Sequence, residues 1–210
     1  MTATPLIYIV EDDASTRASL HRLLGAAGYE ARAYGSTGEF LLDPLPDRSG
    51  CLLLDVRLPG PSGLELQAAL QRQGVALPVI FLTGHADVAS CLQAMKAGAV
   101  DFLEKPIEPK ALLAAILTAL ARENSIRAAR NEERKSRERL NSLSPRERQI
   151  LDRVVVGKLN KEIAYELGIS ERTVKTDRSD IMAKLGAVSI AGLARQTEQL
   201  RHALREDKLS

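Results

Sequence analysis

The chain has 210 residues, enough for one large domain or two small ones, and its 45% hydrophobic content is that of an ordinary globular protein. Aromatic residues make up 3% and tryptophan is absent, which argues against a surface that stacks on sugars or bases. No apolar run reaches about 18 residues and no secretory signal is recognisable, so we expect a cytoplasmic protein with no membrane span. Cys51 and Cys91 lack metal-ligand spacing and are expected to be reduced core thiols.

The formal net charge of +2 conceals a gradient along the chain. Residues 1–121 carry 9 basic and 13 acidic side chains, a balance of −4. Residues 122–142 carry 7 basic and 4 acidic side chains, and residues 143–210 carry 13 basic and 10 acidic side chains, a balance of +3 in each case. An acidic first part and mildly basic later parts suggest modules with different partners, although so small an excess does not by itself predict nucleic-acid binding.

In the first part, short apolar runs alternate with segments of helical periodicity. Apolar runs that stop at turn residues are typical of buried parallel strands. Five strands alternating with five helices predict an α/β fold with a doubly wound parallel sheet, whose right-handed crossovers bring all strand C-termini to one edge. The expected strands are Leu6–Val10, Tyr29–Tyr34, Cys51–Leu54, Pro78–Leu82 and Val100–Glu104, and the expected helices are Ala14–Leu24, Thr37–Leu42, Gly63–Gln73, Ala86–Ala97 and one that begins near Pro109.

Polar side chains collect where these strands end. Glu11 and Asp12 follow the first strand, and Asp55, Thr83 and Lys105 follow the third, fourth and fifth. A lone Asp after a strand is more often a helix cap or turn former, so the prediction depends on the whole set. Crowded carboxylates normally hold a cation, and a purely oxygen ligand set favours Mg²⁺ over zinc. With a hydroxyl and an ammonium beside them, they indicate phosphoryl transfer to Asp55 as nucleophile.

These residues resemble the acidic pair, phosphoacceptor, switch hydroxyl and lysine of the response-regulator receiver family. The resemblance implies a flavodoxin-like fold over residues 1–121, a sensor histidine kinase as phosphodonor, and a cis Lys105–Pro106 peptide bond. It also implies that Mg²⁺ is bound directly by Asp12, Asp55 and the backbone carbonyl of Arg57. Glu11 would act mostly through water, in a position where Asp is common.

The same resemblance makes Phe102 an aromatic switch. When the phosphoryl group draws Thr83 inward, Phe102 would fill the vacated space and repack the surface of residues 86–98 and 99–104. Plain core packing explains Phe102 equally well. By resemblance, Arg57 and His85 would tune how long the phosphoryl group survives, although a solvated helix start also explains His85.

Residues 110–140 contain neither proline nor glycine and are rich in Ala, Leu, Glu and Arg, which favours helix. After Leu120 the apolar stripe thins and charge takes over, so the pattern is too weak to predict a coiled coil. We expect residues 122–142 to form a solvated helical linker with Glu/Arg pairs, either continuous or broken near Asn124.

The last part, residues 143–210, is predicted to be a small all-α domain of four helices. Ser144, Pro145 and Glu147 form a capping box with a proline start. The tight turn at residues 168–170 joins the second and third helices into a helix-turn-helix. The expected helices are Pro145–Val156, Asn160–Leu167, one that starts at Ser170 or Glu171 and ends at Leu185, and Ser189–Leu204.

The third of these helices has two chemically distinct faces. Val174, Ile181 and Leu185 share one face and are expected to be buried, whereas short polar and basic residues lie opposite, as in a helix that enters the major groove. An ordinary packing domain, or a module that binds protein or RNA, is the alternative on spacing alone. The candidate DNA-binding residues are Lys161, Arg172, Thr173, Lys175, Thr176, Arg178 and Ser179, of which Lys161 and Arg178 could reach phosphates.

Five short segments are similar to the LuxR-type (GerE-like) DNA-binding domain: LSPRER from Leu143, NKEIA from Asn160, LGIS from Leu167, TVK from Thr173 and IMAKLG from Ile181. With the receiver ahead of it, the whole chain is similar to the FixJ/NarL class of two-component regulators, and its receiver is closer to FixJ.

Two residues depart from this family pattern. Asp177 stands where the family usually has His, and Asp180 stands where Asn is common. If exposed to DNA, each should weaken phosphate contacts by about 1 kcal/mol. The alternative is that they pair with Arg178 or Lys184.

The resemblance implies a phosphorylation-dependent transcription regulator. After phosphorylation of Asp55 by the histidine kinase, a homodimer would bind two half-sites in double-stranded promoter DNA, with RNA polymerase as a further candidate partner. The chain would not be an enzyme beyond phosphorylating and dephosphorylating its own Asp55. One alternative is a constitutive DNA-binding protein whose receiver only docks or dimerises. Another is a phosphatase, although haloacid-dehalogenase-type enzymes have an Asp where this chain has Arg57.

Overall fold

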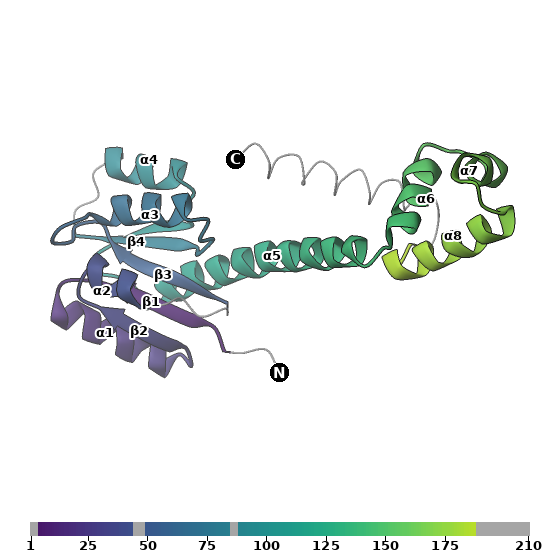
Figure 1. The fold of residues 1–210 in the computed structure, drawn as a ribbon. Coiled ribbons are helices and arrows are strands. Elements are labelled where there is room, and N and C mark those ends of the chain that lie inside the picture. Colours follow the sequence, from purple (N-terminus) through teal and green to yellow (C-terminus); the bar gives the residue numbers. More distant parts are fainter. Residues whose placement is uncertain (1–3, 44–48, 85–87, 188–210) are drawn as a thin grey trace. The chain divides into compact units, whose positions relative to one another are not determined.

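A computed structural model of the chain describes residues 4–43, 49–84 and 88–187 (Figure 1). The chain divides into two compact units, Met1–Ala128 and Ala129–Ser210, and the division falls inside one long helix. Two sequence expectations, the role of His85 and the helix at Ser189–Leu204, lie outside the described residues. Among the residues that are described, no helix combines the length and the apolar character needed to cross a bilayer.

The first unit contains a five-stranded sheet with the strand order β2-β1-β3-β4-β5, in which every neighbouring pair is parallel. This confirms the predicted doubly wound, flavodoxin-like α/β fold. The reversal of strand order beside β1 creates the crevice where such sheets bind ligands. The strands are β1 (Leu6–Val10), β2 (Glu30–Tyr34), β3 (Gly50–Asp55), β4 (Val79–Thr83) and β5 (Asp101–Glu104), and the helices between them are α1 (Ala14–Ala26), α2 (Thr37–Leu42), α3 (Gly63–Arg72) and α4 (Val88–Lys96).

Two apolar layers sandwich this sheet. Every residue of β1, β3 and β4 is buried, because alternate side chains point to opposite faces and both faces are covered. Leu66 and Leu70 of α3 belong to the layer on one face, and Leu24 of α1 and Ile116 belong to the layer on the other. Figure 1 shows α3 and α4 on the opposite side of the sheet from α1. The strand ends are therefore held rigidly at the edge where the polar residues collect.

Helix α1 ends two residues later than the sequence suggested. The expected stop at Gly25 is wrong, since α1 continues to Ala26, and the left-handed backbone occurs at Gly28, with φ of 84°. The N–H of Ala27 donates to the carbonyls of Gly25 and Leu23, which closes the last turn. A glycine inside a helix costs about 1 kcal/mol but does not end it. Only the glycine that must adopt a positive φ marks the end.

All the described secondary-structure elements of the second unit are helices. The sequence left open whether the linker helix is continuous or broken near Asn124. It is continuous, as part of the single helix α5 (Pro109–Asn141). This helix carries surface ion pairs such as Arg134–Glu138, at 3.1 Å. The predicted capping box of Ser144 and Glu147 is present at the start of α6. A compact core of Leu, Ile and Val residues joins the three helices that follow α5. These are α6 (Pro145–Val155), α7 (Asn160–Leu167) and α8 (Glu171–Leu185).

Candidate functional site

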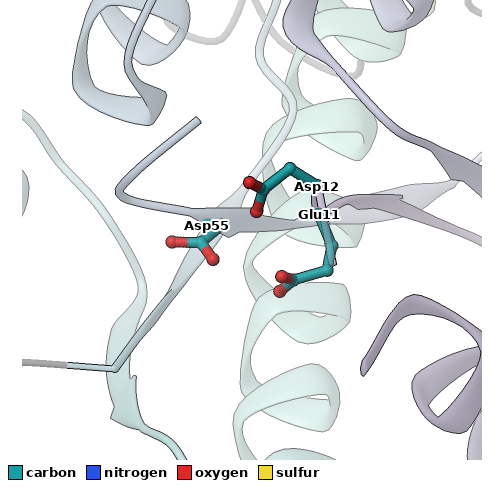
Figure 2. A group of neighbouring side chains, drawn as sticks. All are labelled: Glu11, Asp12 and Asp55. Atoms are coloured by element: carbon teal, nitrogen blue, oxygen red, sulfur yellow. The ribbon is translucent and has the colours of Figure 1, made fainter. Parts of the chain in front are cut away.

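Three carboxylates from two neighbouring strand ends meet at the C-terminal edge of the sheet. Glu11 and Asp12 directly follow β1, and Asp55 is the last residue of β3, which pairs with β1. Each acid offers one carboxylate oxygen, and these oxygens all lie within 4.8 Å of one another. Figure 2 shows the three carboxyl groups gathered at this edge. Parallel pairing thus brings together acids that are far apart in sequence.

Lys105 also contacts this acid cluster. It lies one residue after β5, the strand at one edge of the sheet. Its Nζ lies 2.6 Å from Glu11 Oε2 and 2.5 Å from Asp55 Oδ2. The Lys105–Pro106 peptide bond is cis, as the family resemblance implied. One ammonium therefore bridges two carboxylates that would otherwise repel each other.

The pKa values of the bridged groups reflect their burial. Burial raises the pKa of Glu11, the hydrogen bond from Lys105 opposes that rise, and the nearby charge of Asp55 adds to it. Burial alone would lower the pKa of Lys105, but hydrogen bonds to Asp55 and Glu11 and their negative charges raise it above its usual value. The lysine is thus charged at neutral pH, while charge on Glu11 is costly. A divalent cation would relieve that cost, and the all-oxygen donor set suits Mg²⁺.

The segment after β3 fixes the carboxylate of Asp55. The backbone N–H of Arg57 donates to Asp55 Oδ1 at 2.8 Å, and the N–H of Gly63 donates to the carbonyl of Val56 at 3.1 Å. A Cβ on Gly63 would lie 2.2 Å from the carbonyl oxygen of Asp55, so α3 can begin this close to β3 only with glycine. The structure thus places Arg57 beside Asp55, while the role of its carbonyl as a metal ligand stays a prediction.

Thr83 and Phe102 lie on the two strands beyond β3. Thr83 ends β4 and is buried, and its carbonyl accepts a hydrogen bond from the backbone N–H of Lys105 at 2.7 Å. Phe102 of β5 is half-buried on the sheet face that α3 and α4 cover, with its ring centroid 6.1 Å from that of Phe81. Phe102 is therefore part core and part surface, and its switching role stays a prediction.

Asp13 and Arg17, which also lie near the cluster, have contacts that the sequence did not reveal. Asp13 is the N-cap of α1, because its Oδ1 accepts hydrogen bonds from the Ser15 hydroxyl and the Thr16 N–H, each at 2.7 Å. The hydrogen bond from Ser15, followed by those from Thr16, lowers the pKa of Asp13 to about 2. An Asp immediately before a helix could have revealed this cap. The guanidinium of Arg17 donates to the backbone carbonyls of the two acids that follow β1, and no spacing in the sequence signals that contact.

A cavity of about 240 Å³ opens between α1 and the segment after β5. The hydroxyl side chains of Ser15, Thr16 and Ser19 line it, together with Lys105 and apolar residues. Lys105 therefore belongs both to the acid cluster and to the wall of this cavity.

The helix-turn-helix forms around the left-handed Gly168, which has φ of 65° and separates α7 from α8. The apolar face predicted for α8 is buried, with Val174, Ile181 and Leu185 in the domain core. The candidate DNA-binding residues lie elsewhere on these helices: Lys161, Arg172, Lys175, Thr176 and Ser179 are exposed, and Thr173 and Arg178 are half-buried.

The two half-buried candidates also have partners inside the domain. The hydroxyl of Thr173 lies 2.8 Å from that of Ser170, the N-cap of α8. Arg178 Nη1 donates to the side-chain oxygen of Asn160 at 2.5 Å, which ties α8 to the start of α7. These contacts fix the orientation of α8 within the domain.

Asp177 follows neither of the two expectations for it. Its side chain is buried, and Arg146 binds it at two points, with Nη2 donating to Oδ1 at 3.0 Å and Nε 2.9 Å from Oδ2. Arg178 instead binds Asn160, and Lys184 pairs with Glu147 at 2.8 Å. Position 177 lies three residues after Val174, on the inner face of α8, so the carboxylate points away from the exposed face. Asp180, by contrast, is exposed.

Comparisons with known proteins identify both units. Residues 7–117 match the response regulator receiver domain, and residues 141–197 match the bacterial regulatory proteins of the luxR family. Nodulation protein W of Bradyrhizobium diazoefficiens is 44% identical over 195 residues, which cover 93% of this chain and 86% of that protein. The transcriptional regulatory protein FixJ of Azorhizobium caulinodans is 43% identical over 191 residues, 90% of each chain.

Solved structures of response regulators also match most of the chain. The low-resolution structure of the response regulator StyR is 42% identical and has a TM-score of 0.85, covering 94% of this chain and 100% of its own. Full-length FixJ from B. japonicum is 38% identical with a TM-score of 0.57, covering 96% of this chain and 99% of its own. The chain therefore belongs to the FixJ/NarL class of two-component response regulators, transcription regulators in which a receiver domain is joined to a LuxR-type DNA-binding domain.

Proposed function

We propose that a sensor histidine kinase phosphorylates Asp55 and that the phosphorylated chain dimerises on promoter DNA. The observation that carries this proposal is the contact between Asp55 and Lys105, at 2.5 Å, inside a cluster of three acids at the ligand-binding edge of the sheet. A buried carboxylate held between a cation site and an ammonium is equipped to accept a phosphoryl group.

The transfer requires little beyond positioning and charge compensation. An oxygen of Asp55 forms a bond to phosphorus as the P–N bond to the kinase histidine breaks, and the imidazole leaves with the bonding electron pair. Asp12 and Asp55, with Glu11 and the Arg57 carbonyl, would hold Mg²⁺, which when bound neutralises charge on the phosphoryl oxygens. Lys105, whose ammonium contacts Asp55, would neutralise the same charge.

The output would arise on the α4–β5 side of the receiver. Thr83 would donate its hydroxyl to the new phosphoryl group, and Phe102, half-buried on β5, would repack in response. The surface of α4 already exposes Leu92 at 53% and Met95 at 44%. Burying these apolar side chains between two copies would stabilise a dimer.

In the dimer, two copies of α8 would enter the major groove at adjacent half-sites of double-stranded DNA. The exposed Arg172, Lys175, Thr176 and Ser179 would contact bases or backbone, and Lys161 would contact phosphate. We further propose that the protein acts in the cytoplasm, with RNA polymerase as a further partner at the promoter. We assign it no enzymatic activity beyond phosphorylating and dephosphorylating its own Asp55.

The test combines chemical labelling with a measurement of mass in solution. Wild-type protein treated with acetyl phosphate and Mg²⁺ should gain one phosphoryl group by mass spectrometry and sediment as a dimer, whereas Asp55→Asn should do neither. Asp152→Asn, a matched change at an exposed residue of α6 outside the receiver, should behave as wild type. If wild type takes up no phosphoryl group, the chain acts instead as a constitutive DNA-binding protein. If Asp55→Asn still dimerises on treatment, Asp55 is not the switch.

A further inference from the structure

We infer that Arg17 of α1 is a positioning residue for the metal-site acids: its guanidinium holds the backbone carbonyls of Glu11 and Asp12 and so fixes the two side chains toward Asp55. The inference rests on the Mg²⁺ site proposed above and adds to it a residue outside the predicted ligand set.

The contact is made by a single nitrogen of the guanidinium. Arg17 Nη1 donates to the carbonyl oxygen of Glu11 at 2.6 Å and to that of Asp12 at 3.1 Å. The backbone of Arg17 is itself fixed, because its N–H donates to the carbonyl of Asp13 at 2.9 Å within the first turn of α1. A charged donor attached to a regular helix therefore reaches back to two successive carbonyls.

These two carbonyls lie where neither strand nor helix provides a partner by its own pattern. The strand pairing of β1 ends at Val10, the N–H of Glu11 still donates to the Tyr34 carbonyl at 3.1 Å, and α1 begins only at Ala14. Glu11 is fully buried, so an unpaired carbonyl there would be costly. Arg17 fills that gap with a charge-assisted hydrogen bond.

The position of this backbone decides where two of the three acids point. Mg²⁺ requires near-ideal octahedral geometry at about 2.0–2.1 Å, so a small displacement of its ligands costs affinity. Removing a group that hydrogen-bonds to metal-ligating residues and orients them typically lowers metal affinity by about 10–100-fold. We therefore expect Arg17→Ala to weaken Mg²⁺ binding by at least about tenfold.

The experiment measures Mg²⁺ affinity directly on the full-length protein by isothermal titration calorimetry. Arg22→Ala is the matched control, since Arg22 lies on the same helix, is exposed, and donates from Nη2 to the hydroxyl of Ser19 at 3.3 Å rather than to the backbone of the acids. Arg17→Ala should bind Mg²⁺ more weakly, Arg17→Lys should fall between it and wild type, and Arg22→Ala should match wild type. Labelling by acetyl phosphate should slow in Arg17→Ala at low Mg²⁺ and approach the wild-type rate at saturating Mg²⁺.

Several results would overturn the inference. One is an unchanged Mg²⁺ affinity in Arg17→Ala, and another is a labelling defect that saturating Mg²⁺ does not relieve, which would indicate general damage to the site. If Arg17→Ala fails to unfold cooperatively, Arg17→Lys decides, and a wild-type affinity in that variant refutes the positioning role. If wild type itself binds no Mg²⁺, the proposed metal site fails instead.

Discussion

Asp177 and Arg146 form a two-point ion pair that fastens the middle of α8 to the first turn of α6. Glu147, the next residue of α6, accepts hydrogen bonds from Lys184, near the end of α8, through both carboxylate oxygens, each at 2.8 Å. Two consecutive residues of α6 thus hold α8 at two points along its length. The orientation of the face that we propose enters the major groove therefore depends on charges that lie on its inner side.

The Asp177–Arg146 pair should contribute both stability and DNA affinity. Asp177→Ala removes a charge-assisted contact, and because Arg146 is half exposed and screened by water we expect a loss of about 1–2 kcal/mol in unfolding free energy. DNA affinity should fall as well, since α8 loses an anchor. Urea unfolding and a double-mutant cycle with Arg146→Ala would measure the coupling between the two side chains. A coupling energy of zero would contradict the prediction.

Asp180, on the same helix, should behave in the opposite way. Its side chain is exposed, so Asp180→Ala should leave the unfolding free energy nearly unchanged. DNA affinity should rise by up to about 1 kcal/mol because one negative charge is removed beside the phosphates. Binding measured over a series of salt concentrations would show the gain shrinking as salt increases. Weaker binding in this variant would mean that Asp180 makes a favourable contact.

Glu147 should make the stability of the DNA-binding domain depend on acid pH. The hydrogen bond from Lys184, followed by that from the backbone of Ser144, lowers the pKa of Glu147 from 4.5 to about 2. Since the folded pKa lies below the unfolded one, the stabilisation is complete above about pH 4.5 and is lost as pH falls toward about 2. The stability difference between wild type and Glu147→Gln should therefore shrink over that window. Urea unfolding of both proteins at a series of pH values would measure this difference, and a difference that stays constant across the window would contradict the prediction.

Two glycine substitutions should have opposite effects on the receiver. In Gly63→Ala the new Cβ would meet the Asp55 carbonyl oxygen at 2.2 Å, so we expect a loss of about 1–3 kcal/mol and slower phosphorylation. Gly25 lies inside α1, and a methyl group added there would meet no heavy atom within 4 Å, so Gly25→Ala should gain about 0.5–1 kcal/mol. Thermal unfolding and acetyl phosphate labelling would measure both effects. A tolerated Gly63→Ala would show that the start of α3 can move without disturbing Asp55.

The sequence was sufficient for the sheet and for the acid cluster, because both depend on short-range patterns. Leu6–Val10 lies between Pro5 and Glu11 and forms β1 with the predicted limits. Once strands and helices alternate, parallel pairing alone brings Glu11 and Asp55 to the same edge. Residues whose positions follow from strand register are therefore predictable.

Contacts made by long side chains were not predictable in the same way. Arg17 and Arg146 each reach their partners across a turn or between helices, and their spacing in sequence is compatible with several directions. The continuity of α5 was also open, since helix propensity is similar on both sides of Asn124. There the helix continues, and the hydroxyl of Ser125 donates to the Ala121 carbonyl at 3.0 Å without breaking it.

Lys105 should compete with Mg²⁺ for the oxygens of the acid cluster. Its ammonium bridges Glu11 and Asp55, so Lys105→Met, which keeps an unbranched side chain but removes the charge, should leave the two acids repelling each other and lower the unfolding temperature. Mg²⁺ should then bind on the order of tenfold more tightly, because it no longer displaces an ammonium. The rise in unfolding temperature on adding Mg²⁺ should therefore be larger in Lys105→Met than in wild type or in the exposed control Lys110→Met. An equal or smaller rise would mean that Lys105 supports the metal site rather than competing with it.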